Sequence, residues 1–266
     1  MLVAGIDIGS GTTKCVLVDE VGTVRGRGQA RTRADFEKVA REAVAAALDA
    51  AGFHGDAVGY TATTGLGRYA VPFRDIQITD LTCGARGAAT ACPEARFVLD
   101  IGAQCSRAIH LRDGGKVKEF HMNEKCAAGS GGFLERAAKY LEVSLADIGP
   151  LSLGAARPQA ISSVCAVLAE TEIINHVSEG VTVENILRGI HNSLADRALS
   201  LLKRVGLDGP VAFIGGVARQ EGMVVALRDK LGVPVLVPEG PQFAAALGAA
   251  LLGRQRFLKT GRPAAA

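Results

Sequence analysis

The feature that most constrains the fold is a segment that occurs twice. When Asp7 is superposed on Asp100, an offset of 93 residues, both copies read as an apolar run, Asp-Ile-Gly, a polar turn, a second apolar run and a turn with glycine. These patterns are typical of β-hairpins. The simpler alternative is chance likeness between two hairpins. Matched positions and matched flanking runs favour an internally duplicated α/β fold of two lobes with mixed sheets.

Strand-like and helix-like segments alternate along the rest of the chain. Residues 35–52 have the apolar spacing of a helix that ends at Gly52, and residues 59–71 read as a strand entering a glycine-rich turn. We expect residues 1–94 to form an N-terminal lobe, completed by a C-terminal helix over 243–262. Residues 95–242 are expected to form the C-terminal lobe, with a nucleotide cleft between the lobes.

Composition excludes several classes of protein. The chain has 266 residues, 21% of them charged, and a net charge of +3, which is too weak to indicate nucleic-acid binding. No apolar run is long enough for a membrane span and no signal peptide is recognisable, so a soluble cytoplasmic protein is expected. The six cysteines include no CxxC pair, and a cytoplasmic chain keeps them reduced.

Three glycine-rich turns each follow a strand: DIGSGTT, DIGAQCS and FIGGVA. Such turns let backbone N–H groups converge on phosphate oxygens, because glycine permits close approach. The paired carboxylates Asp7 and Asp100 could hold Mg²⁺ through water. The chain has neither a P-loop nor a Rossmann fingerprint. Three structural tight turns are the alternative, but their order and the paired aspartates favour nucleotide binding. The candidate nucleotide-binding residues are Gly9, Ser10, Gly11, Thr12, Thr13, Lys14, Gly102, Ser106, Gly215, Gly216 and Val217.

Two cysteines stand where helices are expected to begin. Cys126 precedes a glycine-rich turn and an amphipathic segment, and Cys165 lies in the expected first turn of a helix capped by Ser162 or Ser163. The partial positive charge at a helix N-terminus stabilises a thiolate or an anionic ligand. From the residues alone, two small core cysteines remain the favoured interpretation.

The order of the three turns resembles the superfamily of actin, heat-shock chaperones and sugar kinases. More narrowly, TGLGR, MNEKCAAGSGGFLE, ISSVCAVLAETEII and GGVARQEG are similar to the BadF/BadG/BcrA/BcrD ATPase family. This family comprises activators of 2-hydroxyacyl-CoA dehydratases and ATPase subunits of benzoyl-CoA reductase. The resemblance covers nearly the whole chain and reverses the interpretation of the two cysteines.

The resemblance implies a dimer that binds ATP/ADP and Mg²⁺ and shares one 4Fe-4S cluster, ligated by Cys126 and Cys165 of each subunit. Four thiolates from a twofold dimer match the four irons of such a cluster. It further implies Asp7, Asp100 and Gln104 as catalytic residues. Reduced ferredoxin or flavodoxin would supply electrons, and a separate iron–sulfur acyl-CoA reductase or dehydratase would accept them.

The second turn departs from the family pattern. Activators typically carry Gly-Gly-Gln-Asp there, whereas this chain has Gly102-Ala103-Gln104-Cys105. The lost carboxylate predicts altered hydrolysis and suits one half of a heterodimer. This change, with the segment VPFRDIQITDLTCGARGA, favours the benzoyl-CoA reductase branch over the dehydratase activators. A sugar or N-acetylglucosamine-type kinase with Asp100 as general base, and a silent regulatory ATP-binding module, remain as alternatives.

Overall fold

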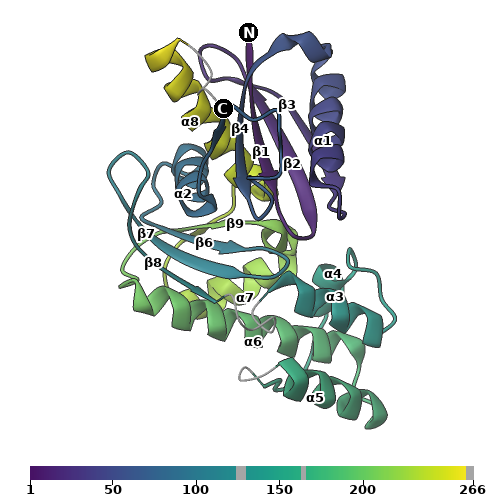
Figure 1. The fold of residues 1–266 in the computed structure, drawn as a ribbon. Coiled ribbons are helices and arrows are strands. Elements are labelled where there is room, and N and C mark those ends of the chain that lie inside the picture. Colours follow the sequence, from purple (N-terminus) through teal and green to yellow (C-terminus); the bar gives the residue numbers. More distant parts are fainter. Residues whose placement is uncertain (124–129, 163–165, 262–266) are drawn as a thin grey trace. The chain divides into compact units, whose positions relative to one another are not determined.

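The computed structural model describes residues 1–123, 130–162 and 166–261, which form two compact units (Figure 1). The first unit contains Met1–Glu94, Leu111–Lys118 and the described residues from Pro238 onward. The second contains Ala95–His110 and the described residues of Glu119–Val237. Across the described ranges, no helix has the length and hydrophobicity needed to cross a membrane.

In its described residues, the first unit combines one mixed sheet with three α-helices. The sheet has the order β3-β2-β1-β4-β5, in which β1 pairs antiparallel with β2 and parallel with β4. The elements are β1 (Leu2–Ile8), β2 (Thr12–Val18), β3 (Val24–Arg31), β4 (Val58–Gly65), β5 (Ile76–Gln77), α1 (Phe36–Ala51), α2 (Asp80–Ala91) and α8 (Ala244–Thr260).

The second unit has a sheet of the same design and a larger set of helices. The sheet order is β8-β7-β6-β9-β10, with β6 antiparallel to β7 and parallel to β9. The elements are β6 (Phe97–Ile101), β7 (Ser106–Arg112), β8 (Lys116–Asn123), β9 (Val211–Ile214), β10 (Val235–Leu236), α3 (Gly131–Tyr140), α4 (Ile148–Leu153), α5 (Ala166–Ser178), α6 (Val183–Arg204) and α7 (Glu221–Leu231). Of these, the end of β7 and the start of β8 fall within Leu111–Lys118, which is grouped with the first unit.

The two sheets share one strand topology, so the duplication extends beyond the hairpins that are visible in the sequence. In each sheet the first strand of a three-strand meander also pairs in parallel with a fourth strand, and a fifth lies outside the fourth. This confirms the expected duplicated α/β fold with mixed sheets.

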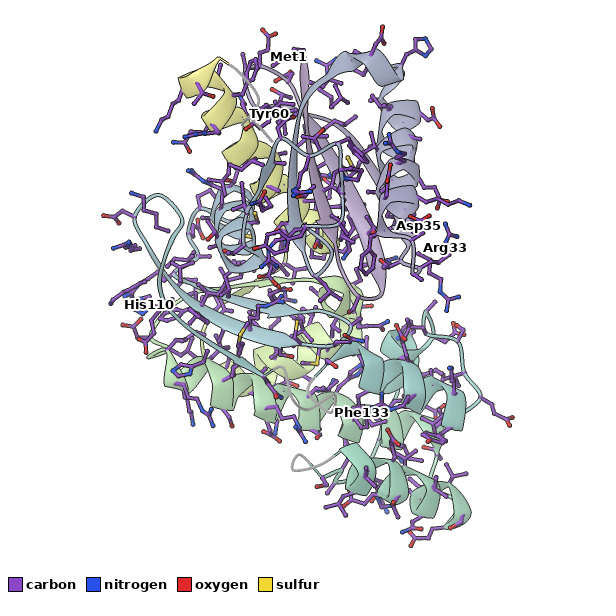
Figure 2. All side chains as sticks on the ribbon, viewed as in Figure 1. Met1, Arg33, Asp35, Tyr60, His110 and Phe133 are labelled. Atoms are coloured by element: carbon purple, nitrogen blue, oxygen red, sulfur yellow. The ribbon has the colours of Figure 1, made fainter. Side chains whose placement is uncertain are left out.

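Helix α1 confirms the helix expected over 35–52. Asp35 accepts a hydrogen bond from the backbone N–H of Lys38 at its start, and Gly52 ends it in the left-handed conformation (Figure 2). The helix lies against β3, whose Gly28 has no room for a side chain, since a Cβ atom there would lie 2.3 Å from the carbonyl oxygen of Ala43. Alternating arginines and glycines therefore form a strand that hydrophobic patterning does not reveal.

Helix α8 is held in the first unit by small residues. It contacts α2, β1 and β4. A Cβ atom at Gly248 would lie 1.8 Å from the carbonyl oxygen of Cys83, and one at Gly87 would lie 1.8 Å from that of Ala244. The glycines thus allow α2 and α8 to approach backbone to backbone, which explains the small-residue composition of both helices.

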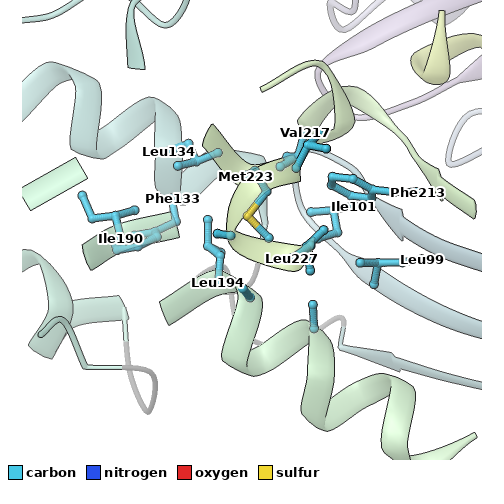
Figure 3. Close-up of a cluster of buried hydrophobic side chains, with 14 of the residues drawn as sticks. Leu99, Ile101, Phe133, Leu134, Ile190, Leu194, Phe213, Val217, Met223 and Leu227 are labelled. Atoms are coloured by element: carbon cyan, nitrogen blue, oxygen red, sulfur yellow. The ribbon is translucent and has the colours of Figure 1, made fainter. Parts of the chain in front are cut away.

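The core of the second unit lies beneath α3, α6 and α7. Figure 3 shows Met223 of α7 among Phe133 and Leu134 of α3 and Leu194 of α6. Phe133, Leu134, Leu194 and Met223 are each at most 1% exposed. The start of α3 is therefore anchored by large buried side chains in its first turn, and this helix stands directly behind the second glycine turn described below.

Candidate functional site

The first glycine turn connects β1 and β2 beside a carboxylate. Strand register places Asp7 opposite Lys14, and the Lys14 ammonium donates to Oδ2 of Asp7 at 3.2 Å. The two side chains are only 13% and 12% exposed, for lysine and aspartate respectively. On its other side Asp7 pairs with Thr64 of β4, which Gly65 follows with a φ of +85°. A Cβ atom at Gly65 would lie 2.5 Å from Oδ1 of Asp7, so glycine is required there.

A residue beyond β3 holds this first turn in place. The Thr32 hydroxyl donates to the carbonyl oxygen of Gly9 at 2.8 Å and lies 2.9 Å from the hydroxyl of Thr13. The backbone N–H of Thr32 donates to the carbonyl oxygen of Gly11 at 3.1 Å. Because these carbonyls are bonded within the protein, the turn has a defined conformation. Sequence reasoning missed Thr32, since nothing in its local pattern indicates a contact with a turn that lies more than twenty residues earlier in the chain.

The second unit repeats the carboxylate arrangement residue for residue. Asp100 of β6 lies opposite Arg107 of β7, and the guanidinium donates to Oδ2 of Asp100 at 3.0 Å. On the parallel side Asp100 pairs with Ile214 of β9, and Gly215 follows with a φ of +89°. A Cβ atom at Gly215 would lie 2.6 Å from Oδ1 of Asp100. Each predicted catalytic aspartate therefore has a cation on one side and a glycine of positive φ on the other.

The start of α3 holds the second turn, in the way that Thr32 holds the first. The backbone N–H of Gly131 donates to the carbonyl oxygen of Gly102 at 2.8 Å, and that of Gly132 donates to the carbonyl oxygen of Ala103 at the same distance. The turn is also closed by a bond from the N–H of Gly102 to the carbonyl oxygen of Cys105 at 3.0 Å. The α3 N-terminus therefore meets the turn directly.

The other predicted residues of the second unit differ in exposure. Gln104 is exposed, Cys105 is partly exposed and Ser106 is buried. Gly216 opens a short 3₁₀ helix and has open space where a side chain would stand, while Val217 is buried. The structure thus brings the second and third glycine turns together around Asp100, through Gly215.

The arrangement suits the binding of a phosphorylated, metal-bound ligand in each unit. A carboxylate beside a cation accepts hydrogen bonds from metal-bound water, and glycine turns expose backbone N–H groups to anions. Within the described ranges, no cluster of three or more His, Cys, Asp or Glu side chains is placed to hold a metal ion by itself. A bound Mg²⁺ would therefore need ligands from water and phosphate as well as from the protein.

The two motif cysteines, Cys126 and Cys165, lie outside the described residues, as does Ser163. The described residues that follow them are α3 and α5, which contact each other within the second unit. Arg136 of α3 donates to Glu170 of α5 at 2.5 Å.

The remaining buried cysteines behave as core residues. Cys15 and Cys83 are 0% exposed and Cys92 is 8% exposed, as expected for structural thiols. Burial raises the pKa of all three, that of Cys83 to about 12. Their thiols are poor nucleophiles and poor metal ligands at neutral pH, because the thiolate is the reactive form.

Sequence reasoning also missed Gly65, Arg136 and Glu170. Gly65 could have been found, because it follows a strand in the same way as Gly215 in the FIGGVA turn. Arg136 and Glu170 lie 34 residues apart, and only the packing of α3 on α5 brings them into contact.

The chain is similar to known proteins over nearly its whole length. The model of a family described as the BadF/BadG/BcrA/BcrD ATPase family matches residues 4–253. The chain is 43% identical over 272 residues to one of the subunits of benzoyl-CoA reductase from Thauera aromatica, covering 98% of this chain and 96% of that protein. It is 39% identical over 257 residues to the activator of lactoyl-CoA dehydratase of Anaerotignum propionicum, covering 94% and 96%.

A solved structure extends the likeness to three dimensions. The activator of the 2-hydroxyisocaproyl-CoA dehydratase from Clostridium difficile, with bound ADPNP, superposes with a TM-score of 0.93 at 35% identity. The match covers 98% of this chain and 97% of that chain. The fold is therefore that of an actin-like ATPase.

Proposed function

Because the chain belongs to the BadF/BadG/BcrA/BcrD ATPase family, we propose that it hydrolyses ATP to drive low-potential electrons into a partner acyl-CoA reductase or dehydratase. The observation that carries this proposal is the repeated set of aspartate, cation and positive-φ glycine in both units. In each unit this set of residues lies beside a glycine turn. Together with the family match, the repeated set supports ATP as the ligand.

In this proposal the glycine turns bind the nucleotide, and the two aspartates bind Mg²⁺ through water. Residues Gly9 to Lys14 and Gly102 to Ser106 contact phosphates, while Gly215 to Val217 lie near the adenosine. Asp7, Asp100 and Gln104 orient the metal and the attacking water. Phosphoryl transfer needs mainly positioning and charge stabilisation, which such a set supplies. Cys105 replaces a carboxylate of the family pattern, so altered hydrolysis is expected.

The proposed cofactor is one 4Fe-4S cluster per dimer, held by Cys126 and Cys165 of each subunit. Such a cluster carries single electrons, received here from reduced ferredoxin or flavodoxin. The second subunit is either another copy of this chain or a related ATPase subunit. What supports this site is that the helices following both cysteines belong to one unit and contact each other.

The benzoyl-CoA reductase branch is the preferred destination of the electrons. The two named relatives have similar identities, so the preference rests on the segment from Val71 to Ala88 and on Cys105. Part of that segment is structural, since Asp75 accepts a hydrogen bond from the backbone N–H of Thr61 at 2.7 Å. Mixing the protein with both kinds of partner therefore tests this preference.

An anaerobic experiment tests the proposal. Protein purified without oxygen is assayed for iron, for sulfide, for iron–sulfur absorption and for Mg²⁺-dependent ATP hydrolysis. Cys126→Ala and Cys165→Ala should each abolish the iron, whereas the buried control Cys92→Ala should retain it. Asp7→Asn and Asp100→Asn should lower hydrolysis on the order of 100-fold. The surface control Asp229→Asn, which loses only a pair with Arg188, should not.

Partner mixing completes the test. Electron transfer from dithionite-reduced protein to benzoyl-CoA reductase catalytic subunits, compared with a 2-hydroxyacyl-CoA dehydratase, identifies the branch. A colourless, iron-free protein that phosphorylates a sugar would contradict the proposal and support a kinase.

A further inference from the structure

The start of α3 is fitted tightly against the second glycine turn. Besides the two backbone hydrogen bonds to Gly102 and Ala103, a Cβ atom at Gly132 would lie 2.9 Å from the carbonyl oxygen of Ala103. One at Gly131 would lie 3.1 Å from Val217 of the third turn. A change in the conformation of the second turn therefore has to move α3 or break these hydrogen bonds, because the turn and the start of α3 are in direct contact.

Helix α3 is joined to α5 by a clamp of three side chains. Nε of Arg136 donates to Oε1 of Glu170 at 2.5 Å, and the Tyr140 hydroxyl donates to Oε2 of Glu170 at 3.4 Å. Arg136 and Tyr140 are four residues apart, so Glu170 spans two successive turns of α3. The Arg136 and Glu170 side chains are 38% and 20% exposed, so the pair is partly shielded from solvent.

Helix α5 is also held by a narrow apolar stripe and by two polar contacts: Glu172 accepts a hydrogen bond from the backbone N–H of Ser162 at 2.5 Å, and Nε2 of His176 lies 3.4 Å from the carbonyl oxygen of Ala160. Ala169 and Ile173 are fully buried in the core of the second unit. Four large apolar residues of the same helix are instead exposed: Val167, Leu168, Ile174 and Val177. Because few apolar side chains fix α5, its position depends on such polar contacts, and the clamp to α3 is the contact that connects it to the second glycine turn.

We propose that the Arg136–Glu170 pair is a positioning device that makes the placement of α5 depend on nucleotide bound at the second glycine turn. The contacts run from Gly102 and Ala103, through the start of α3, to Arg136 and then Glu170. This inference rests on the proposed function in requiring nucleotide at that turn. Since Cys126 and Cys165 precede α3 and α5 in the sequence, the clamp joins the two helices that follow the proposed cluster ligands.

Hydrogen–deuterium exchange of α5 tests the clamp without relying on cluster or activity. The full chain is compared with and without ADP or a non-hydrolysable ATP analogue, and nucleotide affinity is measured by calorimetry. Wild-type α5 amides should change their exchange on nucleotide binding by about fivefold or more, the lower range of coupling between sites. Arg136→Gln and Glu170→Gln should still bind nucleotide, with an affinity changed by no more than the coupling that they remove, and should lose this change in α5 while α3 still responds.

Two further variants separate coupling from a merely structural loss. The doubly exchanged variant Arg136→Glu/Glu170→Arg should recover the response of α5, because it restores the ion pair. Lys230→Gln removes an interhelical pair of equal length, 2.5 Å to Asp196, and should leave the response intact.

The outcomes are distinct. If wild-type protein binds nucleotide but α5 does not respond, or if Arg136→Gln keeps the response, the inference is wrong while the proposed function stands. If nucleotide does not bind at all, both are wrong.

Discussion

The ammonium of Lys14 lies 3.2 Å from Oδ2 of Asp7, and the β1–β2 register places these two residues directly opposite each other. Arg107 and Asp100 have the same relationship in the second unit, at 3.0 Å. In both units the cation and the carboxylate lie on neighbouring antiparallel strands, next to the glycine turn that connects those strands. The repeated geometry gives each carboxylate a cation beside its Oδ2 atom and a glycine beside its Oδ1 atom.

Removal of the first cation should destabilise the first unit. Lys14→Met leaves Asp7 mostly buried without its ion-pair partner, and we expect a loss of about 1–3 kcal/mol in the free energy of unfolding. Arg33→Met, which removes an exposed pair with Glu42, is the matched control and should change stability by less than about 1 kcal/mol. Urea denaturation measures both. Equal effects of the two substitutions would show that burial of the Asp7 pair has no energetic consequence.

Adjacent glycines of the third turn should differ sharply in their tolerance of alanine. Gly215→Ala forces a side chain into a φ of +89° and against Asp100, so we expect a loss of about 2 kcal/mol or more. Gly216→Ala meets nothing within 4 Å and has no such conformation, so it should be nearly neutral for folding. Thermal unfolding of the two variants side by side checks this. A stable Gly215→Ala protein would mean that the turn relaxes away from Asp100.

Stability should fall in mild acid because of a buried histidine. His191 is 0% exposed, and its Nδ1 atom lies 2.9 Å from the Ser152 hydroxyl, which donates to the carbonyl oxygen of Gly149. Burial, with a smaller effect from Arg188, lowers the pKa of His191 to about 4 from 6.5. The unfolded chain therefore binds the extra proton first as the pH falls.

The stabilising contribution of neutral His191 is complete above pH 6.5 and is lost as the pH falls towards 4. The total is about 3 kcal/mol, from roughly 1.4 kcal/mol per pKa unit. Unfolding free energies from about pH 7 to about pH 4 should show this slope in the wild type, a smaller slope in His191→Gln, and an unchanged slope in the exposed control His54→Gln. An unchanged slope in His191→Gln would refute the assignment.

Thiol labelling should spare two of the cysteines in the folded protein. Because burial raises the pKa of Cys83 to about 12, only about one molecule in 10,000 carries its thiolate at pH 8. Cys15 is equally buried and its pKa is raised as well. Iodoacetamide followed by peptide mass mapping should leave both unmodified until denaturant is added. Rapid labelling of Cys15 or Cys83 in the native protein would contradict the prediction and would mean that the first unit opens locally.

Prediction from the sequence succeeded where chemistry and spacing are local. The hairpins around Asp7 and Asp100, the glycine turns and helix α1 were recognisable, because Asp-Ile-Gly, Gly-Gly and capping residues act on the next few residues of the backbone. Strand β3 was missed, because its glycines face α1 where a hydrophobic strand would carry large apolar residues. The clamp between Arg136 and Glu170 was missed because it depends on packing between two helices.

The sequence by itself determined the duplicated α/β design, the three glycine-rich turns and the membership of an ATPase family, since each is carried by short motifs that can be read along the chain. Only the tertiary structure decided what touches those motifs. Strand register placed a cation and a glycine beside each aspartate. Thr32 forms hydrogen bonds with the first turn, and the start of α3 forms hydrogen bonds with the second. Such contacts join residues far apart in the chain. They form only when burial of the two cores brings the surrounding strands and helices together.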